Sequence, residues 1–385
     1  MKLFLVLGNL RGLCALAIAL HHFHVLQSAS EWSLFRNAGY LVEFFFALSG
    51  FLLYQRYAHS LDSGPQLRQF MIARTCRVYP LHVFILLVFV GFECLKLLLE
   101  RRGIQLNNVS FTGDRALGEI VPNLLLIQAW WPGFNALSFN YPSWIVSVEY
   151  YVYLLFGLVA LMLPRQSAKV FASIAVLALV ALYVGNTPLT NNVLRGLGCF
   201  FAGGVTFRVY VRLRHLRLGP LLGSVLEVLS LGAVYCVMAG SETPQDAALA
   251  ILFCVAVGVF AFEAGGISML LRGRPLAWLG ERWFSVYMTH AAVIFVTTVG
   301  VMMVAKATGT SLMVDLPSAI AGVTTRYIST GSALLDNLLI VVELIVVLGI
   351  STLTYRYIEQ PGIALGKRWN RGRGDESVSS QRLPE

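Results

Sequence analysis

Residues 4–27 read FLVLGNLRGLCALAIALHHFHVLQ, an apolar run that contains one arginine and three histidines. About 20 mainly apolar residues are enough for a helix to cross a bilayer. The run has some likeness to a signal peptide, but Arg11 interrupts the apolar stretch and Leu13, rather than a small residue, precedes Cys14. We therefore interpret residues 4–27 as the first transmembrane helix.

The composition of the whole chain favours the same interpretation. Of its 385 residues, 57% are hydrophobic and 13% are charged, whereas an ordinary soluble protein has about 25% charged residues. A soluble fold of this size cannot bury so much apolar surface, which excludes a soluble enzyme, a disordered scaffold and a secreted disulfide module. The net charge of +9 is attributed to cytoplasmic loops, and we expect no nucleic-acid partner.

Apolar runs of membrane-spanning length recur along the chain, and we expect an all-α, polytopic integral membrane protein with about ten transmembrane helices. The predicted spans are residues 4–27, 38–57, 78–99, 142–163, 168–186, 193–211, 220–239, 246–264, 282–304 and 335–358. The shorter apolar piece Val121–Trp131 is followed by Pro132 and is interpreted as a re-entrant or interfacial helix.

The distribution of basic residues predicts the orientation. With the N-terminus in the cytoplasm, most lysines and arginines of the loops fall on the inner side, as the positive-inside rule requires. Both termini are therefore expected to be cytoplasmic. We expect one transmembrane domain over residues 1–364 and a short, polar, disordered tail over residues 365–385.

Ionisable residues inside a span are costly unless they are paired, so each is a candidate functional residue. Arg11 and His22 are eleven residues apart, which places them on one helix face at a distance of about 16 Å along the axis. Glu43 and Glu149 are predicted at the depth of His22, where a carboxylate could orient the imidazole as a base. The alternative is a structural polar cluster that holds helices together; we favour the catalytic interpretation.

Other polar residues are weaker candidates. Arg74 and Arg77 lie one helical turn apart before the third span and are predicted to point the same way, which suits a phosphate, although flanking positive charge is the alternative. His290, Tyr287 and Arg195 are supporting candidates within or beside later spans. Arg356 and Glu359 are three residues apart, so the simplest interpretation is an ion pair on one helix.

Six motifs, in order, resemble those of the acyltransferase 3 family of membrane acyltransferases. They extend along nearly the whole chain, and the acidic position of the second motif, commonly Asp, is Glu43 here. The motifs are Asn9–Leu13 with His21–Phe23, Val42–Leu52, Arg74–Leu81, Ser143–Tyr153, Ser285–His290 and Tyr355–Pro361. The resemblance is to stand-alone members without an SGNH-type hydrolase domain.

The resemblance implies a ten-helix fold that transfers an acyl group, often acetyl, from cytoplasmic acyl-CoA to a hydroxyl of a surface or exported glycan or glycolipid. It implies His22 as the base or transient acyl carrier, Arg11 as an essential residue, and Arg74 and Arg77 as donor-binding residues. Acyl-CoA is then a co-substrate, and we expect no bound cofactor and no metal. The expected location is a bacterial inner membrane, beside glycan-synthesis machinery.

The residues and the resemblance together give one hypothesis. The phosphates of acyl-CoA meet Arg74 and Arg77, the pantetheine arm passes Arg11, and the thioester reaches His22, which Glu43 or Glu149 orients. The rival hypothesis is a proton-coupled transporter or an exporter of a glycan or lipid, because such proteins also need buried Arg, His and Glu.

Overall fold

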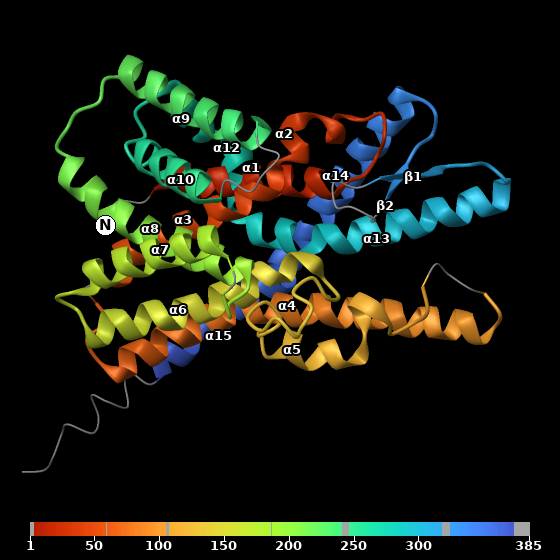
Figure 1. Cartoon of the computed structure of the whole chain (residues 1–385), viewed down its shortest axis with the longest axis horizontal. Coiled ribbons are helices and arrows are strands. Elements are labelled where there is room, and N and C mark those ends of the chain that lie inside the picture. The colour runs from red at the N-terminus through yellow and green to blue at the C-terminus, as the bar shows by residue number, and fades with distance from the viewer. Residues whose placement is uncertain are drawn as a thin grey trace, which may run out of the picture. The chain divides into compact units, whose positions relative to one another are not determined.

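The structure is a computed structural model that describes residues 4–58, 60–104, 108–185, 187–240, 246–317 and 324–372. The chain divides into two compact units, each of which is built from three separate segments, and Figure 1 labels most of their helices and strands. The first unit comprises Met1–Val42, Leu218–Gln245 and Val259–Thr352. The second unit comprises Glu43–Arg217, Asp246–Gly258 and Leu353–Glu385.

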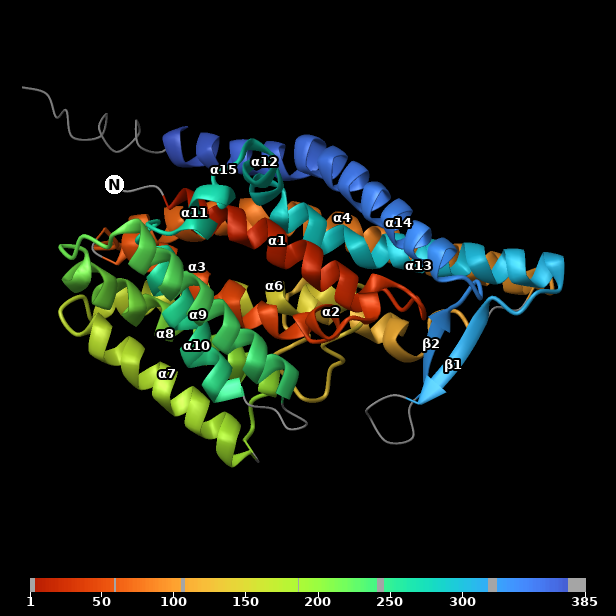
Figure 2. The same ribbon diagram turned by 90° about the horizontal axis from the view of Figure 1, so that it is seen from above.

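The first unit contains the histidine-bearing helix α1 (Leu5–His22), which packs against α12 and α13 (Figure 2). Small residues allow the close approach, since a Cβ atom on Gly12 would lie 2.7 Å from the backbone of Leu279. The other helices of this unit are α2 (Ser33–Arg36), α9 (Pro220–Gly240), α11 (Gly266–Leu271), α12 (Arg274–Glu281), α13 (Trp283–Thr308) and α14 (Ala333–Thr354), with 3-10 turns at Ala29–Glu31 and Ala38–Tyr40.

A β-hairpin follows α13 and was not predicted from the sequence. Strands β1 (Met313–Pro317) and β2 (Thr324–Ile328) are antiparallel, with Asp315 opposite Arg326. The hairpin also pairs with the segment after α1, because the Ile328 N–H donates to the His24 carbonyl at 2.8 Å. The hairpin therefore fixes the chain just beyond the histidines of α1.

The second unit is built around two helices that cross at glycines. The carbonyl oxygen of Ala47 on α3 occupies the place where a Cβ atom of Gly203 on α8 would lie, and Gly50 on α3 meets Phe200 in the same way. The helices of this unit are α3 (Leu41–Tyr57), α4 (Gly64–Arg101), α5 (Ile120–Leu124), α6 (Trp144–Met162), α7 (Ser167–Val184), α8 (Asn191–Leu213), α10 (Asp246–Phe260) and α15 (Gln360–Gly372), with 3-10 turns at Gly113–Arg115, Leu117–Glu119 and Tyr141–Ser143 and a π-helical turn at Tyr355–Glu359.

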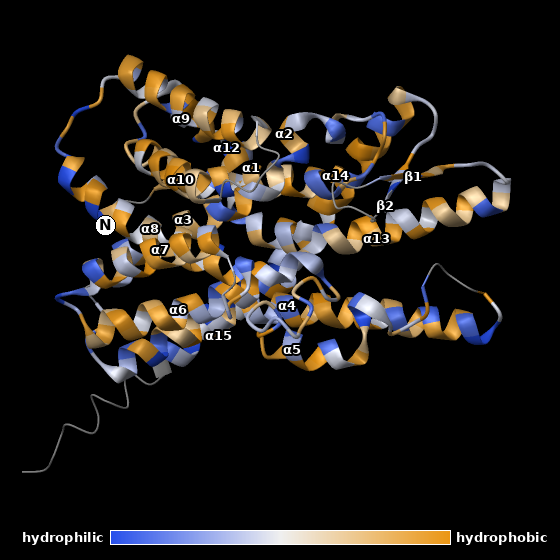
Figure 3. Ribbon diagram, viewed as in Figure 1, coloured by the Kyte–Doolittle hydropathy of each residue, from blue (hydrophilic) through white to orange (hydrophobic). Residues whose placement is uncertain are grey.

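Eight helices among the described residues are long and apolar enough to cross a membrane, and the chain is a predominantly helical, multi-pass membrane protein. Hydrophobic residues occupy most of the length of α9 and α10 (Figure 3). The eight helices are Leu5–His22, Ala38–Tyr57, Gly64–Arg101, Tyr141–Met162, Ser167–Val184, Pro220–Gly240, Trp283–Thr308 and Ala333–Asn370. They correspond to eight of the ten predicted spans.

The other two predicted spans form helices that fall short of the same standard. The run 193–211 is α8, which has 23 residues but carries three arginines, Arg195, Arg208 and Arg212. The run 246–264 is α10, whose 15 residues extend for about 22 Å against a bilayer core of about 30 Å.

The structure differs from the prediction over the first part of the tail. Residues 365–372 continue α15 instead of being disordered, and residues 373–385 lie outside the described residues.

The piece Val121–Trp131 contains only one short helix, the end of α5. The Tyr79 hydroxyl donates to the carbonyl of Leu124, the last residue of α5, at 3.0 Å. Just after this helix, Ser147 of α6 donates to the Leu126 carbonyl at 2.6 Å. Side chains of α4 and α6 thus satisfy carbonyls that no helix uses.

The crossing of α3 and α8 predicts a position-specific effect of adding a methyl group. Gly203→Ala should destabilise the protein by roughly 1–3 kcal/mol, because the new Cβ atom meets backbone that cannot move aside. Gly91→Ala on α4 is the matched control, since nothing lies within 4 Å of a Cβ atom there. Thermal unfolding of the purified protein in detergent tests this, and equal midpoints for the two variants would contradict the packing.

Candidate active site

His22 has a defined orientation within the first unit. Its Nδ1 lies 2.9 Å from the Ile18 carbonyl oxygen one turn earlier on α1. A carbonyl can only accept, so this hydrogen bond places the proton of the neutral ring on Nδ1 and leaves a lone pair on Nε2. The backbone of α1 itself thus selects the tautomer in which Nε2 can act as a base.

His290 of α13 is the second ring at this position. Its Nε2 lies 3.2 Å from Nδ1 of His22, and the two rings stack with centroids 5.1 Å apart. His290 is fully buried, and Tyr287 packs edge-on against it at 5.8 Å. His290 is therefore brought to His22 and Tyr287 to His290, although the sequence did not predict which histidine would be the neighbour of His22.

Arg11 lies beside the same helix, α13, nearer its beginning. Its guanidinium carbon is 5.2 Å from the centre of the Trp283 ring, a cation–π contact. Trp283 and His290 are seven residues apart, or two turns, so they share one face of α13. One face of α1 with Arg11 and His22 thus meets one face of α13 with Trp283 and His290. Sequence reasoning missed Trp283, although its spacing from His290 carried the signal.

Arg36 holds the end of α1 in place. Its guanidinium donates to the carbonyls of Leu20, His21 and Phe23 at 3.0, 2.6 and 2.9 Å. These carbonyls lie where a helix runs out of its own N–H donors. Arg36 also donates from Nη1 to Nδ1 of His24 at 2.8 Å. Burial, reinforced by the charge of Arg36, lowers the pKa of His24 to about 4.

Glu43 and Glu149 belong to the second unit, where each has a polar partner. Oε1 of Glu43, which is 1% exposed, accepts from Nε of Arg195 at 2.7 Å. The Ser49 hydroxyl donates to Oε1 of Glu149 at 2.6 Å. The supporting candidate Arg195 is thus the ionic partner of Glu43. We predicted that Glu43 or Glu149 fixes the His22 tautomer, but the Ile18 carbonyl already does so within the first unit.

Arg74 and Arg77 do not point the same way, which corrects the prediction from their spacing. The guanidinium of Arg74 lies 5.9 Å from the ring centres of Tyr57, Phe70 and Tyr153. Among the described residues, its buried Nε has no hydrogen-bond partner. Arg74 therefore keeps donors for a further group inside an aromatic cage.

Arg77 turns instead toward the end of the chain. Its Nη2 lies 3.7 Å from Oε1 of Glu359, which is fully buried. Glu359 ends the π-helical turn Tyr355–Glu359, and the wider turn changes the spacing that predicted a pair with Arg356. Glu359 is a second residue whose role the sequence did not reveal, because its partner is far away in the chain.

The His24–Arg36 contact predicts a loss of stability in acid. The pKa of His24 is about 4 in the folded protein and about 6.5 in an unfolded chain. The unfolded state therefore binds more protons between these two pH values. The contribution of neutral His24 to the free energy of unfolding is complete above pH 6.5 and is lost as the pH falls to 4. Thermal midpoints of wild type and His24→Gln across this range test this. An identical pH dependence in both would contradict it.

The known proteins that this chain resembles are named for acyl transfer. A family model described as an acyltransferase domain, that of the acyltransferase 3 family, matches residues 6–356. The acyltransferase MdmB of Streptomyces mycarofaciens is 33% identical over 118 residues, which are 30% of this chain and 27% of that protein. YrhL of Bacillus subtilis (strain 168), provisionally named a peptidoglycan O-acetyltransferase, is 24% identical over 336 residues, 76% of this chain and 49% of that protein.

The chain thus spans at most about half the length of these curated relatives. No solved structure matches it significantly. The family model, in contrast, covers nearly the whole chain; it includes the first five motifs in full and ends within the sixth. The chain belongs to the acyltransferase 3 family.

Proposed function

We propose that this chain is an O-acyltransferase that moves an acyl group, acetyl in the simplest case, from acyl-CoA to a hydroxyl of a surface or exported glycan or glycolipid. Membership of the family and the names of the two relatives support transfer of an acyl group. The name of YrhL supports a glycan acceptor. The observation that carries the proposal is the Nδ1–Ile18 hydrogen bond, because it leaves Nε2 of His22 available as a base. We place the protein in a bacterial inner membrane.

The reaction follows from this tautomer. Nε2 of His22 takes the proton of the acceptor hydroxyl while the oxygen attacks the thioester carbonyl. The tetrahedral intermediate collapses, the C–S bond breaks, and the leaving thiolate recovers the proton from His22. The products are an ester and free CoA. His290 contributes by placing a second ring against Nδ1, where a neutral imidazole stabilises the charge that His22 gains.

Arg11 acts at a distance from the reacting bond. At about 16 Å along α1 from His22 it is too far to touch the thioester carbonyl. Trp283 covers one side of its guanidinium, which fixes the charge beside an apolar wall. This charge suits a polar part of the extended donor rather than the oxyanion.

Arg74 is the arginine that we assign to a phosphate of the donor. The guanidinium lies in an aromatic cage and has a buried N–H donor that no described residue uses, which suits an anion, and the planar fork of arginine matches phosphate oxygens. Arg77 is already paired with Glu359 and serves to hold α4 against the end of the chain. The two arginines therefore have different roles in this proposal.

The transporter alternative receives no support from the comparisons, since the matched family and both relatives are named for acyl transfer. A transporter would form no ester between the donor's acyl group and an acceptor hydroxyl.

The role of His22 is tested in a strain that lacks this protein. Complementation with wild type should restore the acyl groups of the surface glycan, whereas His22→Ala should lower transfer by about 100-fold or more, because the base is gone. His215→Ala, an exposed histidine outside the site, is the matched control and should restore acylation. Full acylation with His22→Ala, measured by ester analysis, would overturn the assignment.

Substitution of Arg74 and of Arg77 should have different effects, the first on donor binding and the second on stability. Arg74→Ala should weaken the binding of acetyl-CoA to the purified protein by about tenfold or more, which corresponds to one charge-assisted contact. Arg77→Ala should instead lower stability by roughly 1–3 kcal/mol, because Glu359 loses its ionic partner and Arg77 itself is partly exposed. If Arg74→Ala binds acetyl-CoA as wild type does, Arg74 is not a donor site.

A further inference from the structure

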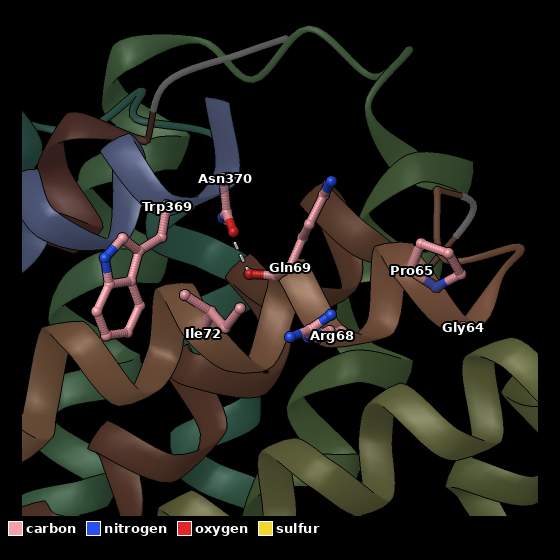
Figure 4. Close-up of a pocket in the computed structure, with 7 residues that line it drawn as sticks. All are labelled: Gly64, Pro65, Arg68, Gln69, Ile72, Trp369 and Asn370. Atoms are coloured by element: carbon pink, nitrogen blue, oxygen red, sulfur yellow. Dashed lines mark hydrogen bonds between the residues drawn. The ribbon is translucent and has the colours of Figure 1, made fainter. Parts of the chain in front are cut away.

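A cavity of about 290 Å³ lies between the first turns of α4 and the last turn of α15, within the second unit (Figure 4). Its lining combines one arginine, two amides, one indole and one aliphatic side chain. The seven lining residues are Gly64, Pro65, Arg68, Gln69, Ile72, Trp369 and Asn370. No step of the proposed reaction uses this cavity.

Two polar side chains of the cavity keep binding capacity that no described residue takes up, those of Arg68 and Asn370. Arg68 forms no ion pair with another described residue. Asn370 donates from Nδ2 to the Gln69 carbonyl at 3.1 Å, which fixes the amide so that Oδ1 is its acceptor. That Oδ1 is buried and has no hydrogen-bond partner among the described residues. The cavity thus offers a cation and an acceptor for which no described residue supplies a donor.

The depth of the cavity follows from the packing of α4 against α6. A Cβ atom on Gly157 would overlap Leu67, and Phe70 lies 3.5 Å from the same point. Gly157 is five residues, or about 7.5 Å, before the end of α6 at Met162. Met162 is apolar and 72% exposed, as expected of a side chain that faces lipid. The first turns of α4 are therefore level with the last turns of a membrane helix.

Helix α15 has the two faces of a helix that lies at a membrane surface. Gly362 and Gly366 pack against Cys76 of α4. The other side exposes basic and large apolar residues together, a combination found on helices that bind the headgroup region. The exposed residues are Leu365, Lys367, Arg368 and Trp369.

We propose that this cavity binds the headgroup of an anionic phospholipid whose headgroup also carries a hydroxyl, such as phosphatidylglycerol. Arg68 pairs with the phosphate, and the headgroup hydroxyl donates to Oδ1 of Asn370. Ile72 and Trp369 contact the glycerol and the first methylenes. Basic cavities between helices at the membrane surface are suited to such headgroups. This lipid site is separate from the proposed function and does not depend on it.

Native mass spectrometry of the full chain in detergent tests the site with three lipids: phosphatidylglycerol, phosphatidylmethanol, which has the charge without the hydroxyl, and phosphatidylcholine. Wild type should bind phosphatidylglycerol most tightly. Arg68→Gln should weaken both anionic lipids by about tenfold. Asn370→Ala should remove the preference for phosphatidylglycerol over phosphatidylmethanol. Arg165→Gln, an exposed arginine outside the cavity, is the matched control and should bind as wild type.

Three results would overturn the proposal. One is equal binding of all three lipids by wild type, and another is unchanged binding by Arg68→Gln. The third is displacement of bound phosphatidylglycerol by coenzyme A in wild type but not in Arg68→Gln, which would assign the cavity to the nucleotide of the donor. Because no acyl transfer is measured, a failure of the proposed function leaves these results unaffected.

Discussion

A polar group inside an apolar helix has no water to bond, so the protein itself must supply its partner. In this chain the most consequential such bond is the one from Nδ1 of His22 to the Ile18 carbonyl. It is made within a single helix turn, and it decides which ring nitrogen is basic. The candidate chemistry rests on this bond, since a base at Nε2 exists only in this tautomer.

The same constraint arranges the charged residues of each unit. Glu43 is buried because Arg195 reaches it, and Glu359 is buried because Arg77 does. Arg36 uses its guanidinium to close the end of α1, so the helix that carries His22 keeps a fixed terminus. Arg74 differs from these residues, because aromatic rings surround it and its Nε remains unused among the described residues. A charge held without an ionic partner is what a binding site for an anion requires.

Much of the architecture could be predicted from the sequence because membrane-spanning runs are long and local. The length of an apolar run alone identifies Leu5–His22 or Trp283–Thr308 as a span. The shared face of Arg11 and His22 follows equally from helix geometry. Alpha-helical spacing failed where the structure departs from a regular helix, as at the π-helical turn that takes Glu359 to Arg77.

Partners that are distant in the chain could not be predicted in this way. His290 reaches His22 across 268 residues, and no periodicity reports such a contact. The directions of Arg74 and Arg77 were missed because one turn of spacing fixes where side chains leave the helix, but not which neighbour draws each long side chain away. The hairpin β1–β2 was missed because its strands have five residues each, too few for a clear alternation beside strongly apolar helices.

The protonation of His22 tests the central claim most directly. Nitrogen-15 NMR of protein labelled at the histidine rings reports which nitrogen carries the proton, and the signal of His22 among the seven histidines is identified by its loss in His22→Gln. We predict a neutral ring with a protonated Nδ1 and an unprotonated Nε2 at neutral pH. A ring protonated at Nε2 and bare at Nδ1 would contradict the hydrogen bond to Ile18 and the base that is built on it.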